Sequence, residues 1–137
     1  MAIFDNINGA LQKKVSKLNS DKQNKMIVRN LNGTYTNDNN GNLVLYPFQA
    51  TEYCVVFFNY RAFTGAGYTE ISVSKTDENS NWLATLHTTY SVSRTLISNS
   101  GLAILAKGEK LQLVFKGGVA NESVGVFGPA VAFKYEL

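Results

Sequence analysis

The sequence predicts an all-β protein, an antiparallel sandwich of about ten strands preceded by a short N-terminal α-helix. From residue 26 onward, short apolar runs rich in strand-forming residues alternate with clusters of Gly, Asn, Ser and Asp, and helical periodicity is absent. Charged residues make up only 17% of the chain, so neutral polar residues meet the solvent, as is typical of all-β surfaces. The helical pattern lies before residue 26.

The N-terminal segment carries apolar residues at spacings of three and four, the pattern of an amphipathic helix with lysines on its other side. We expect this helix within an arm at residues 1–25, followed by one sandwich domain at residues 26–137. The helix could pack on its own domain, hold a trimer together in a short bundle, or attach the protein to a larger assembly. Its apolar side, which we call the attachment face, consists of Phe4, Ile7, Leu11, Val15 and Leu18.

A chain of 137 residues is long enough for one domain with its own core. Cys54 is the only cysteine, which excludes an internal disulfide, and its apolar neighbours predict a buried thiol. The N-terminus lacks a basic leader with an apolar stretch behind it, and no segment reaches transmembrane length. We therefore expect synthesis in the cytoplasm without a signal peptide, and no membrane insertion.

The net charge of +3 is concentrated at the N-terminus. Five lysines precede residue 26 against two acidic residues, whereas the remaining chain holds eight basic and eight acidic residues. A nucleic-acid-binding domain needs a basic face on its folded body. The balanced body therefore predicts no nucleic-acid partner.

Turn residues divide the sandwich domain into strands. Lys107–Lys110 and Asn32–Gly33 have the composition of hairpin turns. Pro47 indicates an edge strand or a strand end, and Pro129 indicates a bulge or break in the last strand. The predicted strands are Met26–Leu31, Thr34–Thr36, Leu43–Phe48, Glu52–Phe63, Tyr68–Lys75, Trp82–Val92, Arg94–Ser98, Leu102–Ala106, Lys110–Lys116 and Ser123–Leu137.

The segment Tyr53–Phe58 is apolar on both of its faces. Antiparallel sheets normally expose one face to water, so something has to cover the second face. We predict that other copies of the chain do so, through Val56, Phe58 and the small residues Ala130 and Ala132. The alternative is a monomer in which the N-terminal helix acts as the cover.

Three stretches resemble the trimeric jelly roll shared by the globular heads of complement subcomponent q and the tumour necrosis factor superfamily. Leu105–Leu113 (LAKGEKLQL) resembles the family's hairpin, Val126–Tyr135 (VFGPAVAFKY) its closing strand, and Tyr53–Phe58 (YCVVFF) one of its inner strands. The Gly that opens that inner strand in the family is absent here, where Thr51 and Glu52 precede Tyr53. The resemblance implies a jelly roll of about ten strands, a tight homotrimer, and ligand contacts on loops and outer faces.

The absence of an export signal argues against a secreted animal factor. Small jelly rolls of this kind also resemble the heads of bacteriophage fibres and receptor-binding or decoration proteins, which are made in the host cytoplasm and assembled into a virion. In such proteins a short N-terminal helix holds the trimer or inserts it into the particle. The resemblance therefore implies a homotrimeric virion protein whose arm contacts other virion proteins and whose head contacts a host-surface glycan. The alternative is a monomeric β-sandwich module that binds a carbohydrate or another ligand.

Patterns typical of catalysis or metal binding are missing. His87 is the only histidine and Cys54 the only cysteine, so a His/Cys zinc cluster cannot form. The oxygen-rich segment Asp77–Asn81 lacks the Gly and the closing Glu of a calcium loop and is predicted to be a hairpin turn. We expect no enzyme activity, no metal and no cofactor. A small hydrolase that uses His87 is the remaining enzymatic alternative.

A binding site on such a domain combines an aromatic ring for stacking with polar groups that orient a ligand. Trp82, which directly follows an Asn-rich loop, is the best single candidate for a saccharide platform, and a buried position at the start of a strand is the alternative. The candidate ligand-binding residues are Tyr60, Arg61, Tyr68, Trp82, His87, Tyr90 and Arg94.

Overall fold

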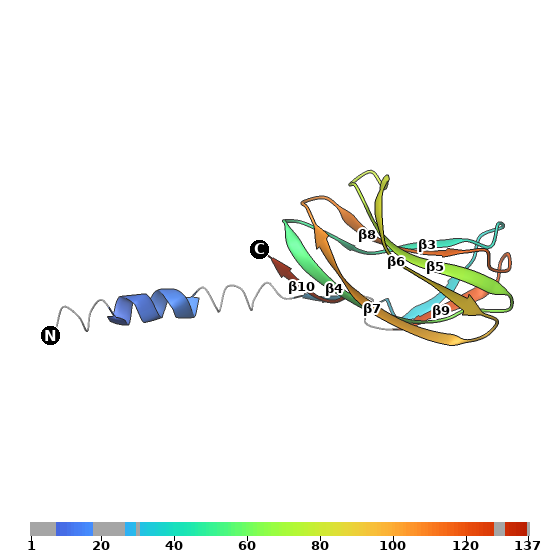
Figure 1. Ribbon diagram of the computed structural model, residues 1–137, viewed down its shortest axis with the longest axis horizontal. Helices are drawn as coiled ribbons and strands as arrows, with labels where there is room; N and C mark the ends of the chain where they lie inside the picture. The colour runs from blue at the N-terminus through green and yellow to red at the C-terminus, as the bar shows by residue number, and fades with distance from the viewer. Residues whose placement is uncertain (1–7, 18–26, 30, 128–130, 137) are drawn as a thin grey trace.

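A computed structural model describes residues 8–17, 27–29, 31–127 and 131–136. Within these ranges the chain forms ten strands and a helix at residues 8–17. The strands make two antiparallel sheets, which Figure 1 shows as two layers packed face to face. The predicted all-β sandwich with a short N-terminal helix is confirmed.

The smaller sheet, which we call sheet B, has four strands. Its order is β3 (Leu43–Gln49), β8 (Lys110–Lys116), β5 (Tyr68–Thr76) and β6 (Trp82–Val92). Pro47 lies in the edge strand β3, as predicted, at a point where the register with β8 shifts. An edge is where a residue without a backbone N–H is tolerated.

The larger sheet, sheet A, is built around β4 (Cys54–Phe63). β7 (Leu96–Leu105) pairs with one edge of β4, and β9 (Ser123–Phe127) and β10 (Val131–Glu136) share the other edge. β2 (Gly33–Thr36) then pairs with β9, and β1 (Ile27–Arg29) pairs with β10.

β9 and β10 act as one strand interrupted by a bulge. Phe127 of β9 lies opposite Arg61 of β4. If this register continued unbroken, Phe133 would lie opposite Val55, yet it lies opposite Phe57. The last strand thus holds extra residues relative to β4, as a bulge requires. Pro129 itself lies outside the described residues.

Local turn chemistry located the turns but not the strand pairs. The turn at Lys107–Lys110 forms, with Gly108 at φ +87° and the N–H of Glu109 donating to the carbonyl of Ala106. However, it leads from β7 in sheet A to β8 in sheet B, so the predicted hairpin is wrong. Asn32–Gly33 is not a hairpin turn either, because β1 and β2 pair with β10 and β9 and not with each other. Packing of the two sheets decides which strands pair.

The two strands predicted on either side of Asn99 and Ser100 are a single strand, β7. Gly101 in its middle lies opposite Phe58 of β4. A Cβ on Gly101 would come within 2.5 Å of Cζ of the Phe58 ring. The Gly therefore does not end a strand; it makes room for an aromatic ring beside the backbone.

The core lies between the inner faces of the two sheets. The even-numbered residues of β4 are all buried, and Val56 and Phe58 are 0% and 3% exposed within a single chain. Their predicted place in a subunit interface is wrong, because the even-numbered face of β4 is the one that joins the core cluster with sheet B. Ala130, also predicted there, lies outside the described residues, as does the side chain of Ala132.

The helix at residues 8–17 presents its apolar side to solvent. Leu11 is 60% exposed and Val15 is 49% exposed, so both are open to contact. The other three residues of the attachment face, Phe4, Ile7 and Leu18, lie outside the described residues. In the part of the chain that the structure describes, no helix has both the length and the apolar character needed to cross a membrane.

Candidate ligand-binding site

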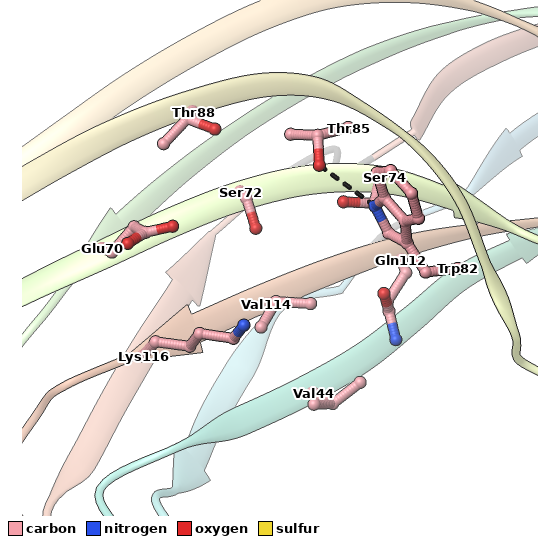
Figure 2. Close-up of a pocket in the computed structure, with 10 residues that line it drawn as sticks. All are labelled: Val44, Glu70, Ser72, Ser74, Trp82, Thr85, Thr88, Gln112, Val114 and Lys116. Carbon is pink, nitrogen blue, oxygen red and sulfur yellow. Dashed lines mark hydrogen bonds between the residues drawn. The ribbon is translucent and has the colours of Figure 1, made fainter.

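The outer face of sheet B carries an open groove of about 470 Å³. Figure 2 shows its lining side chains projecting from all four strands of this sheet. Five of the ten carry hydroxyl or amide groups. The lining residues are Val44, Glu70, Ser72, Ser74, Trp82, Thr85, Thr88, Gln112, Val114 and Lys116.

The alternation of β5 produces the polar lining. Ile71 and Val73 point into the core and are 0% and 2% exposed, so Glu70, Ser72 and Ser74 face the groove. The two serines are not among the candidates chosen from the sequence, which were mostly aromatic or basic. The signal that identifies them is the run TEISVSK, in which every second residue is polar on one side of a half-buried strand.

Trp82 forms one end of the groove. It is the first residue of β6 and is 64% exposed, so the alternative of a buried tryptophan is wrong. Its indole Nε1–H donates a hydrogen bond of 3.1 Å to Oγ1 of Thr85, drawn in Figure 2. The bond satisfies the polar edge of the ring and leaves the apolar ring surface available for stacking.

The hairpin turn before Trp82 is organised by Asp77. The Asp77 carboxylate accepts hydrogen bonds from the backbone N–H groups of Asn79 and Asn81 and from the side-chain amide of Asn81. The backbone N–H of Asn81, followed by its side-chain amide, holds the pKa of Asp77 below its usual value. Asp77–Asn81 is therefore the hairpin turn that the sequence predicts.

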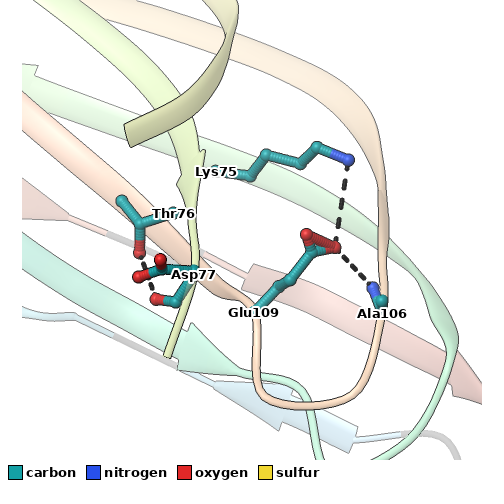
Figure 3. A network of polar contacts seen from close by, with 5 residues as sticks. All are labelled: Lys75, Thr76, Asp77, Ala106 and Glu109. Atoms are coloured by element: carbon teal, nitrogen blue, oxygen red, sulfur yellow. Dashed lines mark hydrogen bonds and ion pairs between the residues drawn. The ribbon is translucent and has the colours of Figure 1, made fainter. Parts of the chain in front are cut away.

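A second turn is tied to the same end of sheet B, as Figure 3 shows. The Glu109 carboxylate accepts a hydrogen bond of 2.7 Å from the N–H of Ala106 and lies 3.9 Å from Nζ of Lys75. Beside it, Oγ1 of Thr76 donates to the carbonyl of Asp77. The Lys75–Glu109 contact connects the β7–β8 turn with the end of β5. It lies next to Thr76, the residue of β5 opposite Trp82.

The other end of this sheet face carries two stacked tyrosines. The ring centroids of Tyr68 and Tyr90 are 5.3 Å apart, their planes are inclined by 19°, and both side chains are more than half exposed. Desolvation, followed by the nearby Tyr90 and the charge of Glu70, raises the pKa of Tyr68. Tyr68 lies two positions before Glu70 in β5, so the pair continues the groove on the same side of the sheet.

The groove has no net charge. Its charged lining residues are Glu70 and Lys116, which occupy directly opposite positions in β5 and β8. Opposite charges at facing positions of a sheet attract and offset each other's field. The arrangement favours a ligand that is polar and uncharged.

Three of the other candidates lie away from the groove. Tyr60 is a core residue, 2% exposed, whose hydroxyl accepts a hydrogen bond of 3.4 Å from Nδ2 of Asn99. Burial raises the pKa of Tyr60 to about 12, so this residue is not available to a ligand. Arg61 is exposed on the outer face of sheet A, and Arg94 lies in the β6–β7 turn with φ +54°.

His87 does not line the groove either. It lies opposite the core residue Val73, beside a register shift between β5 and β6, and is half buried. Its Nδ1 is buried without a hydrogen-bond partner among the described residues. In the same residues, no three His, Cys, Asp or Glu side chains gather closely enough to hold a metal ion.

The outer face of sheet A has the opposite character. Phe57 lies opposite Leu102, and Phe63 lies opposite Leu96, so large apolar side chains meet across β4 and β7. A shallow hollow of about 360 Å³ lies between Phe57 and Leu102. We call apolar face the six side chains of Phe57, Phe63, Leu96, Leu102, Ile104 and Phe127, which are 38–54% exposed.

No protein-family model matches the sequence, and no curated protein matches it. Solved structures give distant matches. The TNF protein Eiger from S. frugiperda is 10% identical, with 82% of this chain and 90% of that chain covered and a TM-score of 0.49. The enzymatically active domain of tailspike protein 4 from bacteriophage CBA120 is 9% identical, with 80% and 18% covered and a TM-score of 0.41. A family 35 carbohydrate binding module from Clostridium thermocellum is 8% identical, with 76% and 93% covered and a TM-score of 0.33.

Proposed function

We propose that this protein is a non-enzymatic, homotrimeric adhesion protein of a bacteriophage virion, either a receptor-binding head or a fibre or capsid decoration, that contacts host-surface glycans through the groove on sheet B. The observation that carries the proposal is the exposed ring of Trp82 at the end of a neutral groove lined by hydroxyl and amide groups.

This combination fits the chemistry of a saccharide. A pyranose ring has an apolar C–H surface that packs on an aromatic ring, and hydroxyl groups that exchange hydrogen bonds with Ser, Thr and Gln side chains. The groove offers Trp82 for the ring surface, and Ser72, Thr88 and Gln112 for the hydroxyl groups. A protein with such a site can bind a glycan without any catalytic group.

The apolar face of sheet A supports self-association. Its side chains are exposed in the single chain, whereas monomers rarely leave large apolar patches in water. Three copies that bury this face would present three grooves, and their avidity would exceed the affinity of one groove by about 10²–10⁴-fold. The proposed interface thus contains Phe57 and Leu102 in place of Val56 and Phe58.

The N-terminal helix supports the link to a particle. Leu11 and Val15 are exposed on its apolar side, and an amphipathic helix of this kind can dock into an apolar groove of a partner. In the proposed assembly, the attachment face contacts other virion proteins and the sandwich domain faces the host. Deleting residues 1–25 should leave a folded domain that no longer joins the particle.

Glycan-array binding tests the adhesive role. The wild-type protein should bind a set of neutral glycans, and Trp82→Ala should weaken that binding at least about tenfold, the effect of losing about 1.4 kcal/mol of stacking. Trp82→Phe, which keeps a ring, should retain part of the affinity. Arg94→Ala, an exposed change in the β6–β7 turn outside both the groove and the apolar face, is the control and should bind like the wild type. Undiminished binding by a folded Trp82→Ala variant would exclude the groove as the site.

Light scattering separates the trimer from the monomeric alternative. The proposed assembly has three times the chain mass of 15.1 kDa. A stable monomer that still binds glycans would instead favour the monomeric carbohydrate-binding module. Equal hydrolysis of glycosides and esters by wild type and His87→Ala, at the rate of the buffer, is the result expected for a protein without enzyme activity.

A further inference from the structure

We infer that the outer face of sheet B binds an extended, neutral glycan chain and not a single sugar ring, with an aromatic platform under each end of the chain. The inference rests on the proposed glycan-binding function and adds the length and the charge of the ligand. The two platforms are Trp82 at one end and the stacked pair Tyr68 and Tyr90 at the other.

β5 and β8 pair without interruption between the platforms, while β6 shifts its register with β5 twice, after Val73 and after Lys75. β5 keeps an unbroken antiparallel register with β8 from Glu70 to Thr76, so every second residue of β5, beginning at Tyr68, lies on one side. Tyr90 lies opposite Glu70 at one end of this row, and Trp82 lies opposite Thr76 at the other. The groove occupies the space between them.

The spacing of the platforms determines the length of the ligand. Tyr68 is the first residue of β5, and the Trp82 ring lies between Thr76, opposite its backbone, and Ser74, opposite its hydrogen-bond partner Thr85. Six to eight steps of about 3.3 Å along β5 give a span of about 20–26 Å. A single sugar ring covers only a small part of that span and can contact one platform at a time. A ligand that contacts both is a chain of several rings lying along β5.

A further ring adds to the Trp82 end. Tyr46 of the edge strand β3 is 44% exposed, and its hydroxyl accepts a hydrogen bond of 3.1 Å from Nε2 of Gln112, a groove residue. Nζ of Lys110 lies 5.2 Å from the centroid of the Tyr46 ring and helps to hold it. This end of the face therefore offers the rings of Trp82 on β6 and Tyr46 on β3, and the side-chain amide of Gln112 on β8.

Charge complementarity selects a neutral chain. Glu70 and Lys116 face each other and offset each other. At the Trp82 end, Nζ of Lys110 donates to Oγ of Ser80, and its charge is offset by the nearby Asp77 carboxylate, so a polyanion would meet carboxylates as well as cations at both ends. An extended peptide is a poor fit as well. Peptide strands bind to the free backbone groups of a sheet edge, whereas the backbone groups of β5 pair with β6 and β8 on both sides.

A ladder of chain lengths tests the inference. The probes are linear neutral glucans and mannans, from monosaccharides to octasaccharides, and hyaluronan as an acidic chain of the same form, each measured by calorimetry with the full chain. Affinity for the neutral probes should rise at least about tenfold from the shortest to the longest, equivalent to about 1.4 kcal/mol. Tyr90→Ala should remove most of this rise while leaving the affinity for the shortest probes within about twofold.

Matched variants separate the ring from the hydroxyl and from stability. Tyr90→Phe keeps the ring and should keep the rise with length. Tyr68→Ala, on the neighbouring strand, serves as a second variant if Tyr90→Ala lowers thermal stability. Trp82→Ala should weaken binding at every length, because short probes occupy the groove beside it.

The possible outcomes distinguish the inference from the proposed function. Equal affinity for monosaccharides and octasaccharides, with dependence on Trp82 retained, would overturn the extended chain and leave the proposed function intact. Tighter binding of hyaluronan than of any neutral probe would overturn the neutral chain. Absence of binding to every probe and to every glycan of the array would overturn the proposed function itself.

Discussion

The outer faces of the two sheets differ, although alternating strands build both. In β4 the outward positions include Phe57 and Phe63, which are as large and apolar as the residues that the strand buries, with Asn59 and Arg61 between them. In β5 the outward positions carry Glu70, Ser72 and Ser74, while Ile71 and Val73 point into the core. The outer face of sheet A thus exposes Phe, Leu and Ile side chains, whereas the outer face of sheet B exposes polar groups between aromatic rings.

In the proposed function, this difference assigns assembly to sheet A and ligand recognition to sheet B. Apolar area removed from water contributes about 25 cal/mol per Å², so an exposed apolar face is stabilised by contact with another copy of itself. Burying hydroxyl and amide groups without hydrogen-bond partners costs free energy. A face made of such groups therefore stays open to water or to a hydroxyl-rich ligand. Each sheet therefore has an outer surface suited to one kind of partner.

Val56→Asp should have the largest effect, because Val56 is fully buried between the sheets. An unpaired charge in the core should cost more than about 4 kcal/mol and abolish the cooperative unfolding transition in urea, followed by circular dichroism. Val55→Asp, one residue away on the outer face, is the matched variant and should remain folded. A folded, dissociated Val56→Asp protein would contradict the position of Val56 in the core.

Leu102→Glu tests the apolar face directly. A charge at this half-exposed position should dissociate the proposed trimer into folded chains of 15.1 kDa, seen by light scattering, because charged groups are not tolerated in the centre of an interface. Thr88→Glu places the same charge on the outer face of sheet B and should leave the trimer intact. Dissociation by Thr88→Glu alone would exchange the roles of the two faces.

Gly101→Ala should have an intermediate effect. The new Cβ would overlap the Phe58 ring, and displacing a core ring costs about 1–3 kcal/mol in urea denaturation. Ser100→Ala, at an exposed neighbouring position of β7, should change stability by less than about 0.5 kcal/mol. Equal stabilities of the two variants would show that Phe58 does not occupy the space beside Gly101.

Tyr60→Phe should have the smallest effect, and only at alkaline pH. Burial, partly offset by the hydrogen bond from Asn99, raises the pKa of Tyr60 from 10.0 to about 12. The unfolded chain therefore loses a proton above about pH 10 that the folded protein keeps, so stability is complete below that pH and decreases by up to about 2 kcal/mol as the pH approaches 12. Tyr60→Phe should lose correspondingly less stability between these values. Identical alkaline slopes for the two proteins would contradict a buried, protonated Tyr60.

Strand periodicity predicted the elements of sheet B closely, whereas the pairing of sheet A required the structure. The predicted strand Trp82–Val92 coincides with β6, and the turn at Asp77–Asn81 was recognisable from its side-chain oxygens. The prediction of two separate strands, Arg94–Ser98 and Leu102–Ala106, was wrong. Gly101 indicates the end of a strand unless the Phe58 ring opposite it is known. Contacts between residues distant in the chain leave no local signal.

The candidate site was predictable in its rings and not in its polar groups. Trp82, Tyr68 and Tyr90 share one side of sheet B, whereas Tyr60 belongs to the core. Aromatic residues serve equally well in a core and in a binding platform, so residue type alone does not separate Tyr60 from the others. The polar rows of β5 and β8 become a groove only when the two strands lie side by side.

By itself, the sequence determined that the chain is an all-β sandwich, that Tyr53–Phe58 is apolar on both faces, and that an exposed tryptophan could follow an Asn-rich turn. Tertiary structure alone decided that Val56 and Phe58 lie inside and Phe57 outside. The physical reason is that side chains alternate between the two faces of a strand. When both faces are apolar, the local sequence does not show which face is buried in the core. Only the packing of sheet B against one of the faces makes that face the core and leaves the other for a partner.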